Sequence, residues 1–251
     1  MIDGFLSRIT CYNIKLFKNK YLNNLIMSDI FVSILIPVYN GFEFFNACIE
    51  SIKMQDYNNY QVIIGINGHD ENSDTFKSAV NISEEVFNDF EDIIVLDLFK
   101  IKGKSNALNK MIKHAKHNWI SILDVDDFWM PNKLSSQIPH TSDYDVIGTN
   151  CRYFGDLNIS PTLPLGDINK FNFFEYNPII NSSCLIKKDL AFWDSEVDGV
   201  EDYDLWLKLK TQNKKFYNVP IILTMHRIHR QSAFNSKGNN LLVNSIKQRY
   251  I

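Results

Sequence analysis

Short apolar runs alternate with amphipathic segments through the first half of this chain. The runs are rich in β-branched residues and too short for helices, and they span residues 32–37, 60–66, 93–96 and 119–123. Between them apolar residues recur at helical spacing, as over residues 44–52. Strands that alternate with helices predict an α/β fold, with a mostly parallel sheet and helices on both faces. Such folds bind their ligands at the carboxyl ends of the strands.

Length and composition indicate one compact domain. The chain has 251 residues, 45% of them hydrophobic and 22% charged, as in ordinary globular proteins. No internal repeat or flexible linker separates the halves. In the less regular second half we expect a polar, loop-rich stretch over 139–181, a strand at 183–186, a helix over 201–211 and a last strand at 221–225.

Charge, cysteines and hydropathy exclude several classes of protein. A net charge of −3 gives no electrostatic reason to expect nucleic acid, which is bound through clustered basic residues. The four cysteines are scattered, as expected for reduced thiols in a cytoplasmic compartment. No apolar run reaches the roughly 20 residues that span a bilayer. We therefore expect a soluble, cytoplasmic protein.

Residues 1–28 form an N-terminal extension whose pattern has several interpretations. Apolar residues recur there at near-helical spacing among basic ones. One interpretation is a helix that contacts a membrane surface peripherally or binds a partner. The others are an extension packed on the domain, or translation from a start codon upstream of a natural start at Met27.

An acidic turn follows the fourth apolar run. Asp124, Asp126 and Asp127 come directly after residues 120–123, which are otherwise apolar apart from one serine. Three carboxylates this close together repel one another, and a hard divalent cation such as Mg²⁺ or Mn²⁺ offsets that repulsion. Closely spaced ionisable groups at a strand end are also typical of functional sites. The turn therefore predicts a metal site that also takes substrate phosphate.

Three segments together resemble the signatures of family 2 glycosyltransferases of the GT-A fold. They are residues 32–40 (VSILIPVYN), the acidic turn with Pro131 after it, and residues 201–206 (EDYDLW), in the family's order and spacing. A lone Asp-x-Asp is common, whereas three ordered motifs are specific. The resemblance implies a metal-dependent, inverting transfer of a hexose or N-acetylhexosamine from a nucleoside-diphosphate sugar to an acceptor hydroxyl.

The resemblance also implies a division of the chain. A Rossmann-like GT-A domain would cover residues 29–235, with a nucleotide-sugar-binding half over 29–127 and an acceptor-side half over 128–235. Residues 236–251 would form a C-terminal tail. The acceptor stays open among a lipid carrier, a polysaccharide, a protein and a small molecule, because variable loops shape its pocket.

Matching positions carry over the expected donor and metal contacts. Asp126 matches the metal ligand. The residues that match base, ribose and nucleotide contacts are Pro37, Val38, Tyr39 and Asp124. His229 lies in an Arg-x-His-x-x-Ser pattern that resembles a segment closing over the diphosphate; it is either a further metal ligand or a packed histidine, since imidazole suits Mn²⁺ but hardly Mg²⁺.

Two positions depart from the family pattern or match it loosely. Asn67 stands where the family commonly has an aspartate that accepts a hydrogen bond from uracil; its amide can accept but also donates, so uridine is favoured and not fixed. Lys104 stands at an expected helix start, where backbone amides and the helix dipole attract phosphate. It is either a donor contact or an ordinary exposed lysine.

The third segment supplies the expected catalytic residues. Asp202 matches the catalytic base, which takes the proton of the attacking hydroxyl, with Glu201 orienting it or the acceptor. Asp204 and Trp206 are expected to be structural. Trp129, beside the carboxylates, is the expected surface for stacking a substrate.

Two rival functions remain at this stage. A haloacid-dehalogenase-type phosphohydrolase also has an Asp-x-Asp after an apolar strand, but Phe128 replaces the threonine or valine of that motif, and three strands precede it here. A non-catalytic nucleotide-sugar-binding module is the other rival. The presence of both Asp126 and Asp202 weighs against it.

Overall fold

The computed structural model describes residues 30–229 and 240–251, so residues 1–28 lie outside what it describes. A nine-stranded sheet runs through this part of the chain. In spatial order its main path is β3 (Ile93–Leu98), β2 (Tyr60–Asn67), β1 (Val32–Val38), β4 (Trp119–Ile122), β8 (Leu185–Lys187), β6 (Val146–Gly155), β9 (Phe216–Ile228) and β5 (Phe128–Trp129), with β7 (Gly166–Asp167) paired to β9.

The first four strands of that path are parallel, as their apolar runs predict. Leu35 of β1 lies between Ile63 of β2 and Ile122 of β4, and β3 extends the sheet beside β2. Every residue of β1, β2 and β4 is buried, which explains why these strands are apolar throughout and do not alternate. Their carboxyl ends therefore share one edge of the sheet.

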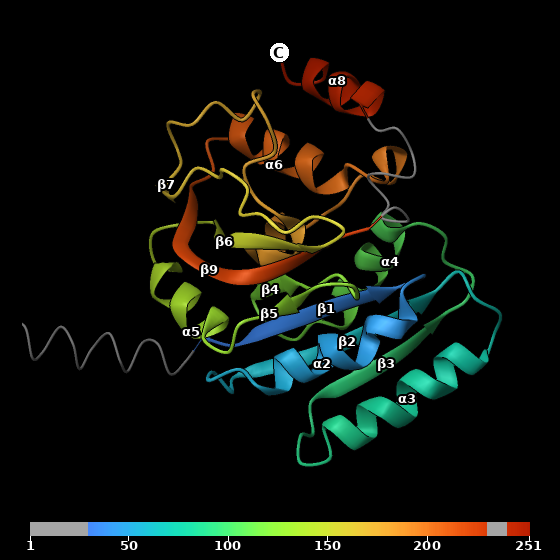
Figure 1. Cartoon of the computed structure of the whole chain (residues 1–251). Helices are drawn as coiled ribbons and strands as arrows, with labels where there is room; N and C mark the ends of the chain where they lie inside the picture. The colour runs from blue at the N-terminus through green and yellow to red at the C-terminus, as the bar shows by residue number, and fades with distance from the viewer. Residues whose placement is uncertain (1–29, 230–239) are drawn as a thin grey trace, which may run out of the picture. The chain divides into compact units, whose positions relative to one another are not determined.

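Helices cover both faces of this parallel half (Figure 1). Crossovers between parallel strands are right-handed, so α2 (Phe45–Lys53) and α3 (Asp74–Val86), which join β1 to β2 and β2 to β3, lie on one face. The connection through α4 (Lys104–Met111) returns from β3 to β4 and places that helix on the other face, beside α6 (Glu201–Thr211). The predicted α/β fold is confirmed.

The main core lies between the sheet and the helices α4 and α6. Leu35, Ile63 and Ile122 share one buried cluster with Leu108 of α4 and Trp206 of α6. The indole N–H of Trp206 donates to the Ile179 carbonyl oxygen at 3.2 Å, so this large ring is both buried and hydrogen-bonded. The expected structural role of Trp206 is confirmed.

The second half of the sheet contains both parallel and antiparallel strand pairs. β8 runs antiparallel to β4 and β6, and β5 and β7 run antiparallel to β9, while β6 and β9 are parallel to each other. The expectation of a loop-rich stretch over 139–181 was wrong in part, because the ten-residue strand β6 lies inside it. Gly148 and Asn150 interrupt the apolar run of β6 in the sequence, but tertiary pairing with β9 overrides that local signal.

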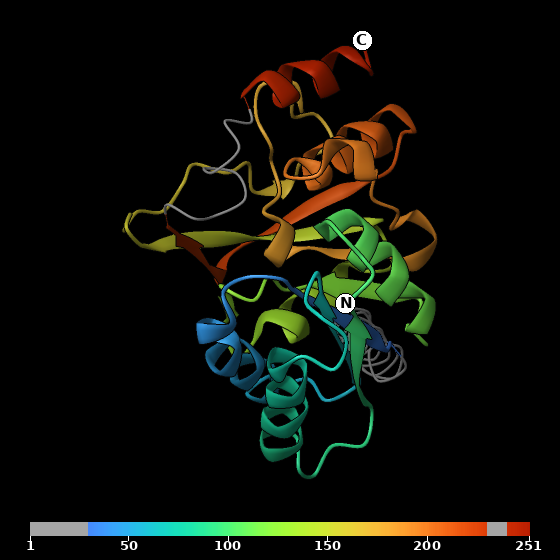
Figure 2. The same ribbon diagram turned by 90° about the vertical axis from the view of Figure 1, so that its right-hand side faces the viewer.

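Short helices complete the described residues. One is α5 (Lys133–Gln137), and the rest are single 3₁₀ turns at Phe42–Phe44, Ile112–His114, Ile138–His140, Asn181–Ser183, Lys188–Leu190 and Ser195–Val197. Residues 240–251 contain α8 (Asn240–Gln248), which lies against α6 in both views (Figures 1 and 2). Tyr250 donates its hydroxyl to Asp204 at 3.1 Å, which gives Asp204 the structural role expected of it.

Helices long and apolar enough to cross a bilayer are absent from residues 30–229 and 240–251.

Candidate active site

The acidic turn lies at the shared carboxyl edge of the parallel strands, directly after β4. The amide of Leu123 donates to the Leu35 carbonyl oxygen, so the chain stays beside β1 up to the turn. The amide of Asp127 then donates back to the Asp124 carbonyl oxygen at 3.0 Å, which closes the turn. The amide of Asp124 itself donates to the Ser182 hydroxyl at 3.1 Å. These hydrogen bonds fix the backbone of the turn that carries the three carboxylates.

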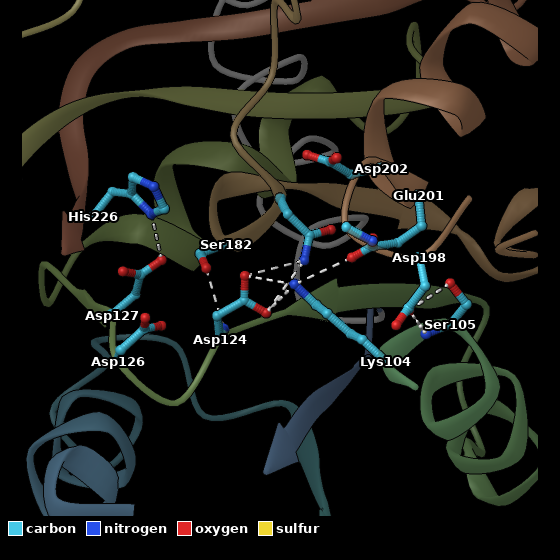
Figure 3. Close-up of polar contacts among 12 residues, drawn as sticks. Lys104, Ser105, Asp124, Asp126, Asp127, Ser182, Asp198, Glu201, Asp202 and His226 are labelled. Carbon is cyan, nitrogen blue, oxygen red and sulfur yellow. Dashed lines mark hydrogen bonds and ion pairs between the residues drawn. The ribbon is translucent and has the colours of Figure 1, made fainter. Parts of the chain in front are cut away.

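Lys104 connects this turn to the start of α6 (Figure 3). Its ammonium nitrogen lies 2.6 Å from one Asp124 oxygen and 3.5 Å from a Glu201 oxygen. Asn181 donates a weaker hydrogen bond to each oxygen of Asp124, at 3.3 and 3.4 Å. The sequence motifs at 124 and 201 are 77 positions apart, and this lysine brings them into one charged cluster.

Opposing effects set the charge state of this cluster. Burial acts to raise the pKa of Asp124, but the charge and hydrogen bond of Lys104 and the hydrogen bond of Asn181 lower it overall. Burial acts in the opposite direction on Lys104, and Asp124 and Glu201 outweigh it, so the lysine pKa is raised. Asp124 and Lys104 are therefore both charged at neutral pH.

Asp202, the expected base, is in a different electrostatic environment. Burial and the adjacent Glu201 charge raise its pKa to about 6, although Lys104 and a hydrogen bond from Asn177 oppose the shift. Asn177 donates its amide N–H to one carboxylate oxygen at 3.0 Å, and the Tyr203 backbone amide donates to the other at 2.7 Å. A carboxylate with this pKa is ionised at neutral pH and is basic enough to accept a proton in a transition state.

Asp127 is the buried member of the turn. Its oxygens accept hydrogen bonds from the His226 ring at 2.8 Å and from the Arg227 amide at 2.7 Å, which fastens the turn to β9. Burial would lower the pKa of His226, but Asp127 and then the charges of Asp126 and Asp124 raise it to about 9. His226 is thus protonated at neutral pH and offsets part of the negative charge of the turn.

Arg227 reinforces the same attachment. Its guanidinium lies 4.0 Å from the ring centre of Phe44 and 4.3 Å from that of Phe154, and its Nε–H donates to the Asp126 carbonyl oxygen at 3.0 Å. The backbone of the acidic turn is therefore fixed from both halves of the sheet.

Asp126 and His229, the expected metal ligands, contact each other at 2.9 Å. Burial and the charges of Asp127 and Asp124 raise the pKa of Asp126, which is the repulsion that a bound cation would relieve. Within residues 30–229 and 240–251, no group of three or more His, Cys, Asp or Glu side chains is arranged so that it could hold a metal ion. The Asp126 carboxylate alone fits Mg²⁺ or Mn²⁺, and the carboxylate together with the His229 imidazole fits Mn²⁺, because these ions take their remaining ligands from water and substrate phosphates.

The expected nucleotide contacts lie at the ends of β1 and β2. Pro37 and Val38 are in β1, and Tyr39 follows it with its side chain 56% exposed. Gly68 has a positive φ of 73°, which favours glycine, and a Cβ added there would lie 2.6 Å from the Tyr39 ring, so that exposed ring would have to move. Asn67 is buried just before that glycine.

The helix start at Lys104 already has an anion. Asp198 accepts hydrogen bonds from the backbone amide and the hydroxyl of Ser105, at 3.1 and 3.2 Å, and so caps α4 from a distant part of the chain. Lys104 is thus available to a phosphate chiefly through its own ammonium group, and less through the helix amides that the sequence also suggested.

One expected contact is wrong. Trp129 cannot stack on a substrate, because it is 2% exposed, donates its indole N–H to the Ser182 carbonyl oxygen and lies under the side-chain nitrogen of Lys133, 3.9 Å from the ring centre. Sequence reasoning also missed Asn177, Asn181 and His226. The asparagines lie in a segment with no periodic pattern, and only the folded chain brings them to the carboxylates.

Comparison with known proteins assigns the family. Residues 33–187 match the model of glycosyl transferase family 2, so the chain belongs to that family and is a glycosyltransferase. This assignment favours the glycosyltransferase hypothesis over the phosphohydrolase one.

Two curated relatives from Escherichia coli match this chain over most of the length of both proteins. The chain is 27% identical over 221 residues to WfaP, described as a UDP-Glc:alpha-D-GlcNAc-diphosphoundecaprenol beta-1,3-glucosyltransferase, covering 84% of this chain and 82% of WfaP. It is 28% identical over 229 residues to WfgD, which has the same description, covering 86% of this chain and 84% of WfgD.

Solved structures agree with the fold. TarS of S. aureus in complex with UDP-GlcNAc superposes with a TM-score of 0.64 at 15% identity, covering 82% of this chain and 61% of TarS. The mannosyltransferase PcManGT of Pyrobaculum calidifontis, in complex with GDP-Man and Mn²⁺, gives a TM-score of 0.62 at 16% identity, covering 80% of this chain and 58% of that one. This chain therefore spans about three fifths of these two solved chains.

Proposed function

We propose that this glycosyltransferase is metal-dependent and inverting, and that it moves a sugar from a UDP-sugar to an acceptor hydroxyl. The observation that carries the proposal is that two sets of acidic residues, those of the acidic turn and those at the start of α6, meet in one site. Lys104 binds Asp124 of the acidic turn and Glu201 of α6, and the residue after Glu201 is a carboxylate with a raised pKa. One site could therefore both stabilise the leaving group and accept the proton of the attacking hydroxyl.

The acidic turn would bind the donor. Asp126, with His229, would hold Mn²⁺ or Mg²⁺ against the donor diphosphate, where the metal would act as a Lewis acid for the departing nucleoside diphosphate. Lys104 lies beside Asp124 and is positioned to add a positive charge as negative charge develops on the leaving group. Pro37, Val38, Tyr39 and Asn67 would contact the nucleoside.

Asp202 would act as the general base. The acceptor O–H bond breaks as its proton moves to the Asp202 carboxylate. The acceptor oxygen forms a bond to the anomeric carbon, and the bond from that carbon to the diphosphate oxygen breaks with its electron pair. A single displacement with one base inverts the anomeric configuration. Glu201 accepts from the Gly199 amide and would orient Asp202.

The nucleotide is tested by ligand-induced stabilisation. A thermal-shift screen compares UDP-, GDP-, dTDP- and CDP-sugars with and without Mn²⁺, because a ligand of the native state raises the melting temperature. We expect the largest shift with a UDP-sugar and metal together. Equal shifts with and without Mn²⁺ would contradict the metal role, and a larger shift with GDP-mannose would reassign the base.

The printed descriptions of the two E. coli relatives support a proposal for the acceptor class. We propose a sugar linked through a diphosphate to a lipid, so that the enzyme meets its acceptor at a membrane surface. UDP-glucose and a synthetic lipid bearing α-GlcNAc diphosphate are the first pair to test, with transfer measured as a mass increase of one hexose on the lipid. Transfer to free oligosaccharides and not to the lipid would refute this acceptor class.

A further inference from the structure

A short segment between β7 and β8 connects the two carboxylate groups of the site. Residues 177–182, here called the bridging segment, begin at Asn177, which donates to Asp202 at 3.0 Å. Four residues later, Asn181 donates to both oxygens of Asp124, and Ser182 accepts from the Asp124 amide. One stretch of chain therefore contacts both the expected base and the donor-side carboxylate.

Buried side chains of the core hold the backbone of the bridging segment in place. The Asn218 side chain donates to the Pro178 carbonyl oxygen at 2.9 Å. The indoles of Trp206 and Trp129 donate to the carbonyl oxygens of Ile179 and Ser182, at 3.2 and 2.7 Å. Because all three donors are buried, the backbone of this segment has little freedom to move.

The amide orientations are also determined. The side-chain oxygen of Asn177 accepts from the Ile179 backbone amide at 3.2 Å, so its NH₂ group is the end that faces Asp202. For Asn181 the partners are carboxylate oxygens, which accept and cannot donate when ionised. Both asparagines therefore present N–H groups to the carboxylates.

Stability alone does not explain Asn181. Asn181 is only 6% exposed, and its amide oxygen has no hydrogen-bond partner among the described residues. An unpaired buried amide oxygen is unfavourable for folding. Such a group at the centre of a site is better explained by a role in function.

We propose that Asn177 and Asn181 are positioning residues, which hold the Asp202 and Asp124 carboxylates at a fixed separation through the rigid bridging segment. Asn177 directs one oxygen of the base, and Asn181 directs the donor-side carboxylate that Lys104 also binds. Positioning of this kind matters because small displacements of reacting groups cost large factors in rate. The inference rests on the proposal that Asp202 is the general base.

The test for Asn177 needs no substrate. In protein with ¹³C-labelled aspartate carboxyls, the Asp202 signal is assigned by its loss in Asp202→Asn and is titrated by NMR. In Asn177→Leu the midpoint should rise by about one pH unit, the size expected for losing one hydrogen bond to a charged group. Glu201, Lys104 and the Tyr203 backbone amide also influence this carboxyl and are unchanged in the variant.

A matched control separates positioning from general damage. Asn169 is another partly buried asparagine that accepts from a backbone amide and donates to a carboxylate, but its partners are Phe216 and Asp167, which are not among the residues of the site. Asn169→Leu should lower the melting temperature and leave the Asp202 midpoint unchanged. An unchanged midpoint in Asn177→Leu would overturn the role of Asn177.

Asn181 is tested through the donor. Calorimetry with UDP-glucose and Mn²⁺ should show affinity about tenfold weaker in Asn181→Leu, with the Asp202 midpoint unchanged. Equal affinity in wild type and variant would refute the role of Asn181. If Asp202→Asn still transfers sugar at the normal rate, the base assignment fails instead, whatever the asparagine variants show.

Discussion

Asp124 and Asp202 are two aspartates of one site with opposite electrostatic behaviour. Both are partly buried, yet the pKa of Asp124 is lowered and that of Asp202 is raised to about 6. The difference follows from their partners. Asp124 lies 2.6 Å from the Lys104 ammonium, whereas Asp202 is next to the like charge of Glu201 and has an amide as its nearest side-chain donor. Identical side chains thus suit different tasks, one to remain charged and one to accept a proton.

The largest effect is expected from a substitution that removes the proposed base and leaves the donor-side residues unchanged. Asp202→Asn should lower the transfer rate by about 10³-fold, within the range that general-base catalysis contributes, while donor binding stays near the wild-type value. Calorimetry and a product assay measure the two quantities. Asp204→Asn is the matched control on the same helix, because Asp204 contacts Tyr250 and Arg249; it should keep the transfer rate. Normal transfer by Asp202→Asn would contradict the assignment.

The next largest effect is expected from a substitution that removes the proposed metal ligand on the donor side. Asp126→Ala should weaken UDP-sugar binding by about 100-fold in Mn²⁺, a loss typical of a missing metal contact. The same titration in EDTA is the control, since the two proteins should then bind the donor equally and weakly. A difference that persists without metal would mean that Asp126 contacts the donor directly.

Removing the shared cation should reduce the contrast between the two aspartates. Lys104→Met keeps most of the side-chain volume but removes the positively charged partner that Asp124 and Glu201 share, so we expect a loss of about 2 kcal/mol in unfolding free energy and a higher pKa for Asp124. Denaturant unfolding measures the first effect. Lys102→Met, two residues away at an exposed position, should change neither quantity.

The smallest effect is a gain in stability with a pH signature. A carboxyl whose pKa is higher in the folded than in the unfolded state binds more protons when folded, so stability falls as pH rises between the two values. For Asp202 that window runs from its ordinary value of 3.8 to about 6. Asp202→Asn should therefore melt about 2–4 °C higher than wild type at pH 7.5, with little difference at pH 4. A gain that is equal at both pH values would refute this explanation.

The parallel half of the fold could be predicted from sequence because its signals are local. The strands that became β1, β2 and β4 are buried on both faces, so they are apolar at every position, and the acidic turn stands out against them. The helix at Glu201–Thr211 was predicted with the same limits. In contrast, β6 depends on pairing with β9 and has a glycine and an asparagine within it, so its local pattern is ambiguous.

The candidate site shows the same division. Motif order and residue type were enough to select Asp124, Asp126 and Asp202 and to predict the family, because carboxylates at a strand end and a helix start are costly without a function. Only the tertiary structure decided that Lys104 joins the two groups, that Trp129 is buried, and that one segment reaches both carboxylates. These depend on distances between residues far apart in the chain, and local sequence patterns carry no information about such distances.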